Sequence, residues 1–225
     1  MAGLSLLGLV HNRTMSPEIA ATLAVAAEER RSLLFVAIPR MAGKSTTMQA
    51  ALQYAPRGTT FHQLTRAAGP SLGIPSAPDS GYLVLSEISG AGFPDYLWGD
   101  DVRLAFKSLA GGGFSLSTAL HAGSVEEAFG VITRENRVPD EHAARIDLVV
   151  YIRSIGHWAQ PIRRAVAQVY EISGVEDGLP DARLLHRWNE ATDSFEVVED
   201  PVRIGTVAAD YEQRLAEFSH AAVGR

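Results

Sequence analysis

Short apolar segments recur along the chain and predict strands. Residues 33–38 and 82–85 are unbroken apolar runs. Such runs are typical of strands that are buried on both faces of a parallel sheet. Residues 114–120 and 146–152 predict two further strands, and residues 59–64 are a weaker candidate.

Helix signals lie between these strands. Ser16, Pro17 and Glu18 form a helix start, because a serine caps the first turn, proline fits the first helical position and an acid suits the N-terminal end. Ser124 and Glu127 match a capping box, which predicts another helix start. The predicted helices cover residues 19–29, 44–52, 100–109, 124–133 and 206–222.

The pattern changes after residue 145. Residues 165–172 alternate between apolar and polar positions and should pair with residues 146–152. Residues 184–188 and 194–198 flank a turn-like segment and predict a hairpin. The prediction is one α/β domain with a helical N-terminal region (1–31), a nucleotide-binding core (32–144), and an antiparallel β-meander with a closing helix (145–225).

Composition narrows the functional classes. The chain has 225 residues, of which 46% are hydrophobic and 20% are charged, as in a globular protein. Its net charge of −6 argues against a dominant role in binding nucleic acid. Cysteine is absent, which excludes disulfides and thiolate chemistry.

The apolar residues 1–10 lack the basic start of a signal peptide. No stretch reaches the roughly 20 apolar residues of a membrane span. We therefore expect a cytoplasmic protein.

The strongest local signal is residues 38–46, which read IPRMAGKST between a predicted strand and a predicted helix. This is the setting of a P-loop, in which backbone N–H groups at a helix N-terminus hold phosphate. Lys44 would reach the β- and γ-phosphates of ATP, and Ser45 would ligate Mg²⁺. Ile38 and Met41 stand where related loops use glycine. The candidate nucleotide-binding residues are Arg40, Ala42, Gly43, Lys44, Ser45 and Thr46.

Glu87 and His121 are the candidate catalytic residues. Each follows a predicted strand, at the edge of the sheet where P-loop enzymes place catalytic side chains. Glu87 would hold Mg²⁺ through water or orient the attacking water, and His121 would sense the γ-phosphate or touch a neighbouring subunit. The plainer alternatives are a solvated glutamate and a loop histidine with a satisfied hydrogen bond.

Three segments in this order resemble the type II/type IV secretion and pilus ATPases. Residues 38–48 are similar to the family's G-P-T-G-S-G-K-S-T-T run, residues 85–89 to its Walker B segment, and residues 112–124 to its histidine box. Residues 9–18 and 146–175 are similar to the segments that flank these motifs, so the resemblance covers about residues 9–176.

The resemblance implies a RecA-like P-loop fold and an ATPase that uses ATP and Mg²⁺. Members of this family form rings, usually hexamers, with nucleotide between subunits. The implied partners are other copies of the chain or a partner ATPase subunit, and membrane-anchored secretion or pilus proteins. The implied location is the cytoplasm, at the inner face of the cell membrane.

The chain also departs from the family pattern. Residues 59–63 lack the acid that the family carries between the P-loop and Walker B, and Ser89 replaces the arginine after the Walker B glutamate. Only about 30 residues precede the first core strand, so the family's N-terminal domain is expected to be missing. Two alternatives to a slow ATPase follow, a non-catalytic assembly or regulatory module and an unrelated small P-loop kinase. Arg163 and Arg164 are interpreted as exposed charges at a strand end, and the alternative is that they reach the nucleotide of a neighbouring subunit.

Overall fold

The computed structural model describes residues 4–38, 41–76, 79–157, 160–205 and 208–223. Within these residues the main sheet has eight strands in the order β10-β9-β8-β7-β1-β6-β3-β2. Five neighbouring strands run parallel to one another. They are β1 (Leu33–Ile38), β2 (Phe61–Gln63), β3 (Gly81–Leu85), β6 (Phe114–Leu120) and β7 (Leu148–His157). The predicted parallel strands are confirmed, and the candidate at residues 59–64 is the short β2.

The other three strands extend this sheet in antiparallel fashion. They are β8 (Gln160–Glu176), β9 (Leu179–Asn189) and β10 (Ser194–Val197). β8 pairs with β7 over the whole length of β7, and the predicted partner at residues 165–172 lies inside it. The hairpin around residues 189–193 is also confirmed, because Ser194 pairs with Asn189. The fold is therefore mixed α/β, with a mostly parallel sheet and an antiparallel C-terminal extension.

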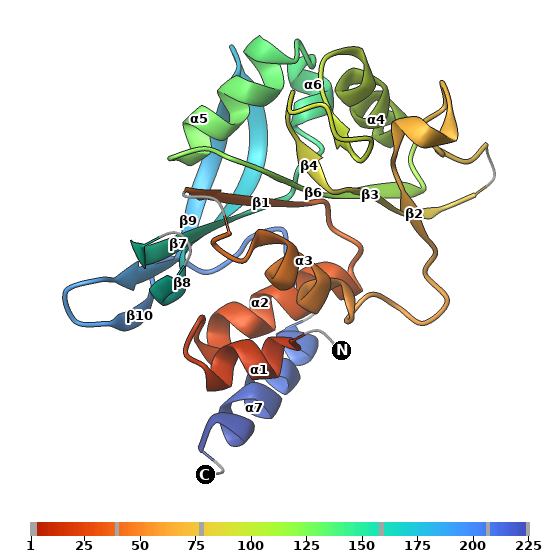
Figure 1. Cartoon of the computed structure of the whole chain (residues 1–225). Helices are drawn as coiled ribbons and strands as arrows, with labels where there is room; N and C mark the ends of the chain where they lie inside the picture. The colour runs from red at the N-terminus through yellow and green to blue at the C-terminus, as the bar shows by residue number, and fades with distance from the viewer. Residues whose placement is uncertain (1–3, 39–40, 77–78, 158–159, 206–207, 224–225) are drawn as a thin grey trace.

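Helices cover both faces of the parallel part of the sheet (Figure 1). One layer holds α1 (Leu6–His11), α2 (Pro17–Glu28), α3 (Lys44–Leu52) and α7 (Ala208–Val223). The other holds α4 (Asp100–Ala110), α5 (Val125–Gly130) and α6 (Asp140–Ala143). Strand β1 feeds both cores, since Leu33 and Phe35 point into the first layer and Leu34 and Val36 into the second. This two-sided burial explains why β1 is apolar from Leu33 to Ala37, whereas Ile38 at its end is exposed.

The predicted helix starts are mostly confirmed. The Ser16 hydroxyl accepts the N–H of Ile19 at 3.4 Å, and Pro17 opens α2. The capping-box prediction is wrong in one detail. Ser124 accepts the N–H of Glu127, but the Glu127 carboxylate accepts the N–H of Gly123 at 2.7 Å, one residue earlier than the box requires. The α-helix ends at Gly130, and a wider helical turn, η2 (Val131–Glu135), completes the predicted segment.

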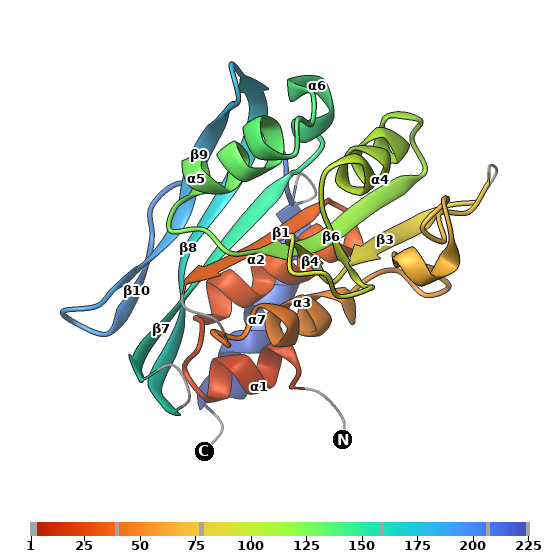
Figure 2. The same cartoon turned by 45° about the horizontal axis from the view of Figure 1, so that its top comes forward.

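Sequence patterns did not predict helix α1. Ser5 caps it by accepting the N–H of Gly8, and its apolar residues Leu6, Leu9 and Val10 are buried against the layer formed with α2, α3 and α7. Figure 2 shows α1 below α3 and close to α7. In the described part of the chain, no helix has the length and apolar character needed to cross a membrane.

The C-terminal helix is tied back to the sheet by one buried carboxylate. Glu171 in β8 is fully buried and accepts the N–H groups of Val202, Arg203 and Ile204. These bonds fix the segment that leads from β10 to α7, and α7 then packs on α2. Arg214 of α7 pairs with Glu28 of α2 across this contact. The predicted closing helix is thus confirmed in place and type.

Candidate functional site

The predicted phosphate loop lies between β1 and α3. Gly43 takes the N-cap position of α3 with φ of +105°, a conformation that favours glycine. The first backbone N–H groups of a helix lack intrahelical acceptors, and no side chain of the described residues caps them here. The Thr47 hydroxyl donates to the Gly43 carbonyl at 3.0 Å and keeps that oxygen turned into the helix. The start of α3 is therefore suited to an anion.

The backbone of the loop has a conformation that favours glycine at a position where this chain has another residue. Met41 stands where related loops often use glycine, and its φ is +63°. A side chain in this left-handed region costs about 1–2 kcal/mol, so the backbone demand for glycine persists although the sequence has lost it. Ala42, in the same loop, is buried. Arg40, a predicted phosphate ligand, lies outside the described residues.

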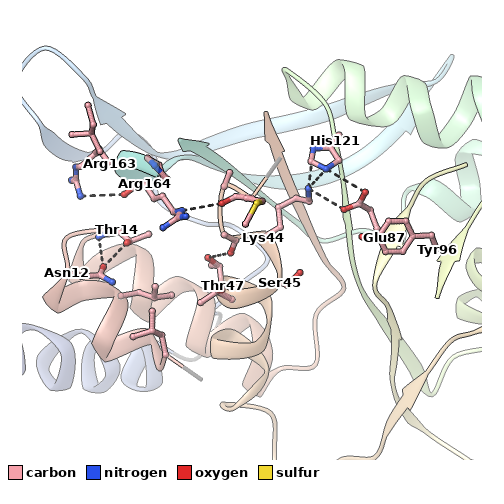
Figure 3. A pocket seen from close by; sticks show the side chains of 18 of the residues that line it. Asn12, Thr14, Lys44, Ser45, Thr47, Glu87, Tyr96, His121, Arg163 and Arg164 are labelled. Carbon is pink, nitrogen blue, oxygen red and sulfur yellow. Dashed lines mark hydrogen bonds and ion pairs between the residues drawn. The ribbon is translucent and has the colours of Figure 1, made fainter. Parts of the chain in front are cut away.

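Three strands bring the predicted lysine, glutamate and histidine together. Lys44 follows β1, His121 follows β6, and Glu87 comes two residues after β3. These strands are neighbours in the order β1-β6-β3, and their carboxyl ends meet at one edge of the sheet. Figure 3 shows the three side chains pointing toward one another. Glu87 begins a short strand rather than ending the preceding one, since β4 (Glu87–Ile88) pairs with β5 (Tyr96–Leu97) and fixes its backbone.

The cluster is compact and largely shielded from solvent. The ammonium of Lys44 lies 3.4 Å from Glu87 Oε2 and 2.9 Å from His121 Nε2. The side chains of Lys44 and Glu87 are only 7% and 13% exposed. Charges this well buried are kept only when they are paired, so Glu87 is the counterion of Lys44 in the free protein.

The hydrogen bonds assign a tautomer to His121. Its Nδ1 lies 3.0 Å from the carbonyl oxygen of Ala37, which can only accept, so Nδ1 carries the proton. In that tautomer Nε2 accepts a hydrogen bond from the Lys44 ammonium at 2.9 Å. Nε2 also lies 3.5 Å from Glu87 Oε1. His121 therefore contacts both members of the Lys44–Glu87 pair and is anchored on the backbone at the end of β1.

A cavity of about 690 Å³ opens over this cluster. Its volume is within the usual range for small-molecule sites. The described candidate residues all line it, and they are Ala42, Gly43, Lys44, Ser45, Thr46, Glu87 and His121. The structure thus brings together every predicted site residue that it describes. Ser45 is exposed at the first turn of α3, where its hydroxyl can reach a ligand.

A magnesium ion fits this set only together with a ligand. In the described residues, no group of three His, Asp or Glu side chains could hold a metal ion. Mg²⁺ is usually bound by one or two protein oxygens, with water and substrate phosphates filling the other positions. The Ser45 hydroxyl and the Glu87 carboxylate line the same cavity and are oxygen donors of this kind.

Comparisons with known proteins assign no family. No family profile matches the chain, and no curated protein matches it. The chain is similar to a solved structure, the VirB11 ATPase from the Brucella suis type IV secretion system in complex with sulphate, at a TM-score of 0.46 and 16% identity. The similarity covers 74% of this chain and 56% of the other, so this chain spans little more than half of that protein.

Several cavity residues were missed by the sequence analysis. Asn12 and Thr14 contribute from the segment after α1, where Asn12 Oδ1 accepts the hydroxyl of Thr14 at 2.6 Å. Phe93 contributes from the loop between β4 and β5 and Tyr96 from the start of β5, and the two rings contact each other edge to face. Residues 9–18 were noted only as a segment that flanks the motifs, and in the Gly-rich loop after β4 only the aromatic pair could have drawn attention. Arg164, interpreted as an exposed charge, also lines the cavity.

Proposed function

We propose that the protein binds ATP with Mg²⁺ at the loop between β1 and α3. The observation that carries this proposal is the buried Lys44. It stands at the uncapped start of α3 and points into a ligand-sized cavity, with Glu87 as its counterion. A buried lysine held beside free backbone N–H groups suits a phosphate chain better than any other common ligand.

The residues have distinct roles in this proposal. Backbone N–H groups of residues 43–46 hold phosphate oxygens, and Lys44 leaves Glu87 to contact them. Ser45 and Glu87 provide oxygen atoms for the metal, which neutralises phosphate charge when it is bound. Glu87 also orients a water molecule for attack. His121 follows the movement of Lys44, because the two side chains share a hydrogen bond.

The finer proposal is a slow ATPase subunit of a secretion or pilus motor. It is supported by the order of the motifs in residues 38–48, 85–89 and 112–124, all of which reach one edge of the sheet. In this proposal the core is RecA-like, copies of the chain or a partner ATPase complete the site, and membrane-anchored secretion or pilus proteins are its partners at the inner face of the cell membrane.

One observation favours a non-catalytic module of such a machine. Strand β2 reads Phe-His-Gln and offers no carboxylate at the edge where the resembled family has its catalytic acid. The Gln63 amide donates instead to the Ser86 hydroxyl at 3.0 Å, next to Glu87. Glu87 would then be the sole carboxylate available to orient water among the described residues that line the cavity. Binding without turnover is the outcome expected of this alternative.

A calorimetric titration of Mg-ATP tests the proposal. Wild type should bind, and Lys44→Ala should lose the heat signal while remaining folded by circular dichroism. Lys107→Ala is the matched control, because Lys107 lies in the last turn of α4 and is exposed. Ser45→Ala, a change at an exposed position, should weaken binding with Mg²⁺ more than without it.

The outcomes separate the alternatives. Phosphate release by wild type that Glu87→Gln abolishes supports the ATPase, and binding with no release supports the non-catalytic module. Failure of folded wild type to bind ATP at millimolar concentration contradicts both.

A further inference from the structure

The hairpin of β7 and β8 carries two adjacent arginines near the phosphate loop, and the two side chains differ in their contacts. Arg163 is engaged in the fold. Its guanidinium pairs with Asp193 at 2.8 Å, donates to the Arg13 carbonyl at 2.6 Å and lies over the ring of Trp188. These contacts hold the hairpin against β9 and the N-terminal segment.

Arg164 turns toward the loop instead. Its Nε donates to the carbonyl of Met41 at 3.2 Å, and its Cδ would lie 3.7 Å from a Cβ added at Gly43 (Figure 3). The side chain is exposed and lines the cavity. Among the described residues, the two terminal nitrogens of its guanidinium have no acceptor, and no carboxylate pairs with it. The residues that the structure describes therefore leave most of the hydrogen-bonding capacity of Arg164 unused.

The charges around the cavity set Arg164 apart. Lys44 is paired with Glu87 and Arg163 with Asp193, so both are neutralised within the free protein. Among the described residues that line the cavity, Arg164 is the arginine that forms no ion pair with a carboxylate. A guanidinium with its terminal N–H groups free can bind phosphate through two parallel hydrogen bonds.

We propose that Arg164 binds the phosphate chain of the nucleotide held by the P-loop of the same chain. Nε anchors the loop through Met41, and the terminal nitrogens contact phosphate oxygens. The arginine thus supplies, from within one subunit, positive charge beside the phosphates in addition to that of Lys44. The benefit grows with phosphate charge, so Arg164 favours triphosphate over monophosphate. This inference rests on the proposed function.

The test is a set of titrations with ATP, ADP and AMP in the presence of Mg²⁺. Arg164→Ala should weaken ATP binding about 10- to 100-fold, the range expected for a lost charge-assisted contact. ADP should lose less and AMP almost nothing. Arg164→Lys should recover part of the ATP affinity because it keeps the charge, and Arg164→Gln should not. Arg187→Ala, which removes an exposed arginine paired with Glu196, should bind like wild type.

Each contrary result identifies what fails. Unchanged ATP affinity in Arg164→Ala overturns the inference and leaves the proposed function standing. The inference is also overturned if Arg164→Ala weakens the binding of all three nucleotides equally and Arg164→Gln has the affinities of wild type. Arg164 would then only anchor the loop. A wild type that binds none of the nucleotides overturns the proposed function, and this inference with it. Because Arg164 is exposed, its variants should melt at the wild-type temperature.

Discussion

In the proposed function, the ion pair between Lys44 and Glu87 opens when Lys44 contacts phosphate. The Glu87 carboxylate therefore competes with phosphate for Lys44, in addition to being a candidate catalytic group. Glu87→Gln keeps the shape of the side chain and removes its charge. We expect the variant to bind ATP more tightly in the absence of Mg²⁺ and to lose any hydrolysis that wild type shows.

The size of the effect follows from the geometry. At 3.4 Å and an effective dielectric constant of about 20, the attraction between the two charges is about 5 kcal/mol. Most of this is offset by the cost of keeping a carboxylate away from water. A net gain of about 1–2 kcal/mol is reasonable, which corresponds to roughly 5- to 30-fold tighter binding of metal-free ATP.

The assay is calorimetry with ATP in EDTA and again with Mg²⁺. The tightening should shrink with Mg²⁺, because the ion loses an oxygen ligand when Glu87 becomes glutamine. Glu212→Gln, at an exposed position of α7, is the matched control and should bind like wild type. Equal or weaker binding of metal-free ATP by Glu87→Gln would refute the competition between carboxylate and phosphate.

Two further predictions concern stability. Gly43→Ala should lower the free energy of unfolding by about 1–2 kcal/mol and weaken ATP binding, because φ at this position is +105°; urea denaturation and calorimetry measure the two effects, and unchanged values for both would contradict the assigned backbone. Burial lowers the pKa of His186 from 6.5 to about 4, against the opposing charges of Glu18 and Asp200. The unfolded chain therefore binds the proton first as pH falls from 6.5 toward 4, and wild type should lose about 2 kcal/mol between pH 7.5 and 5 on this account. In His186→Gln this share of the loss should vanish, and an identical pH dependence in both proteins would show that His186 is not the cause.

Local patterns predicted most of the fold because the sheet leaves clear marks in the sequence. β1 is apolar at every position since both its faces are buried, and Pro17 and Ser16 mark the start of α2 through bonds that involve only neighbouring residues. Short helices and strands give weaker sequence signals. Helix α1 has only 6 residues, and the apolar run that contains it was considered only as a possible signal peptide.

The site residues also differ in whether local sequence could predict them. Gly43 and Lys44 were predicted because a phosphate loop is local in sequence, and Glu87 and His121 because parallel strands share an edge. The approach of Arg164 to Met41 joins residues 123 positions apart, and it depends on how the β7–β8 hairpin packs beside the loop. No periodicity encodes such a contact. Tyr96 reaches the cavity through the pairing of β5 with β4, which is also not local.

The most direct test of the phosphate site is a crystal structure with Mg²⁺ and a non-hydrolysable ATP analogue. The account predicts that Lys44 Nζ leaves its position 3.4 Å from Glu87 Oε2 and contacts a phosphate oxygen at the start of α3. An analogue bound away from α3, or a Lys44 still paired with Glu87 and His121 at saturating analogue, would contradict it.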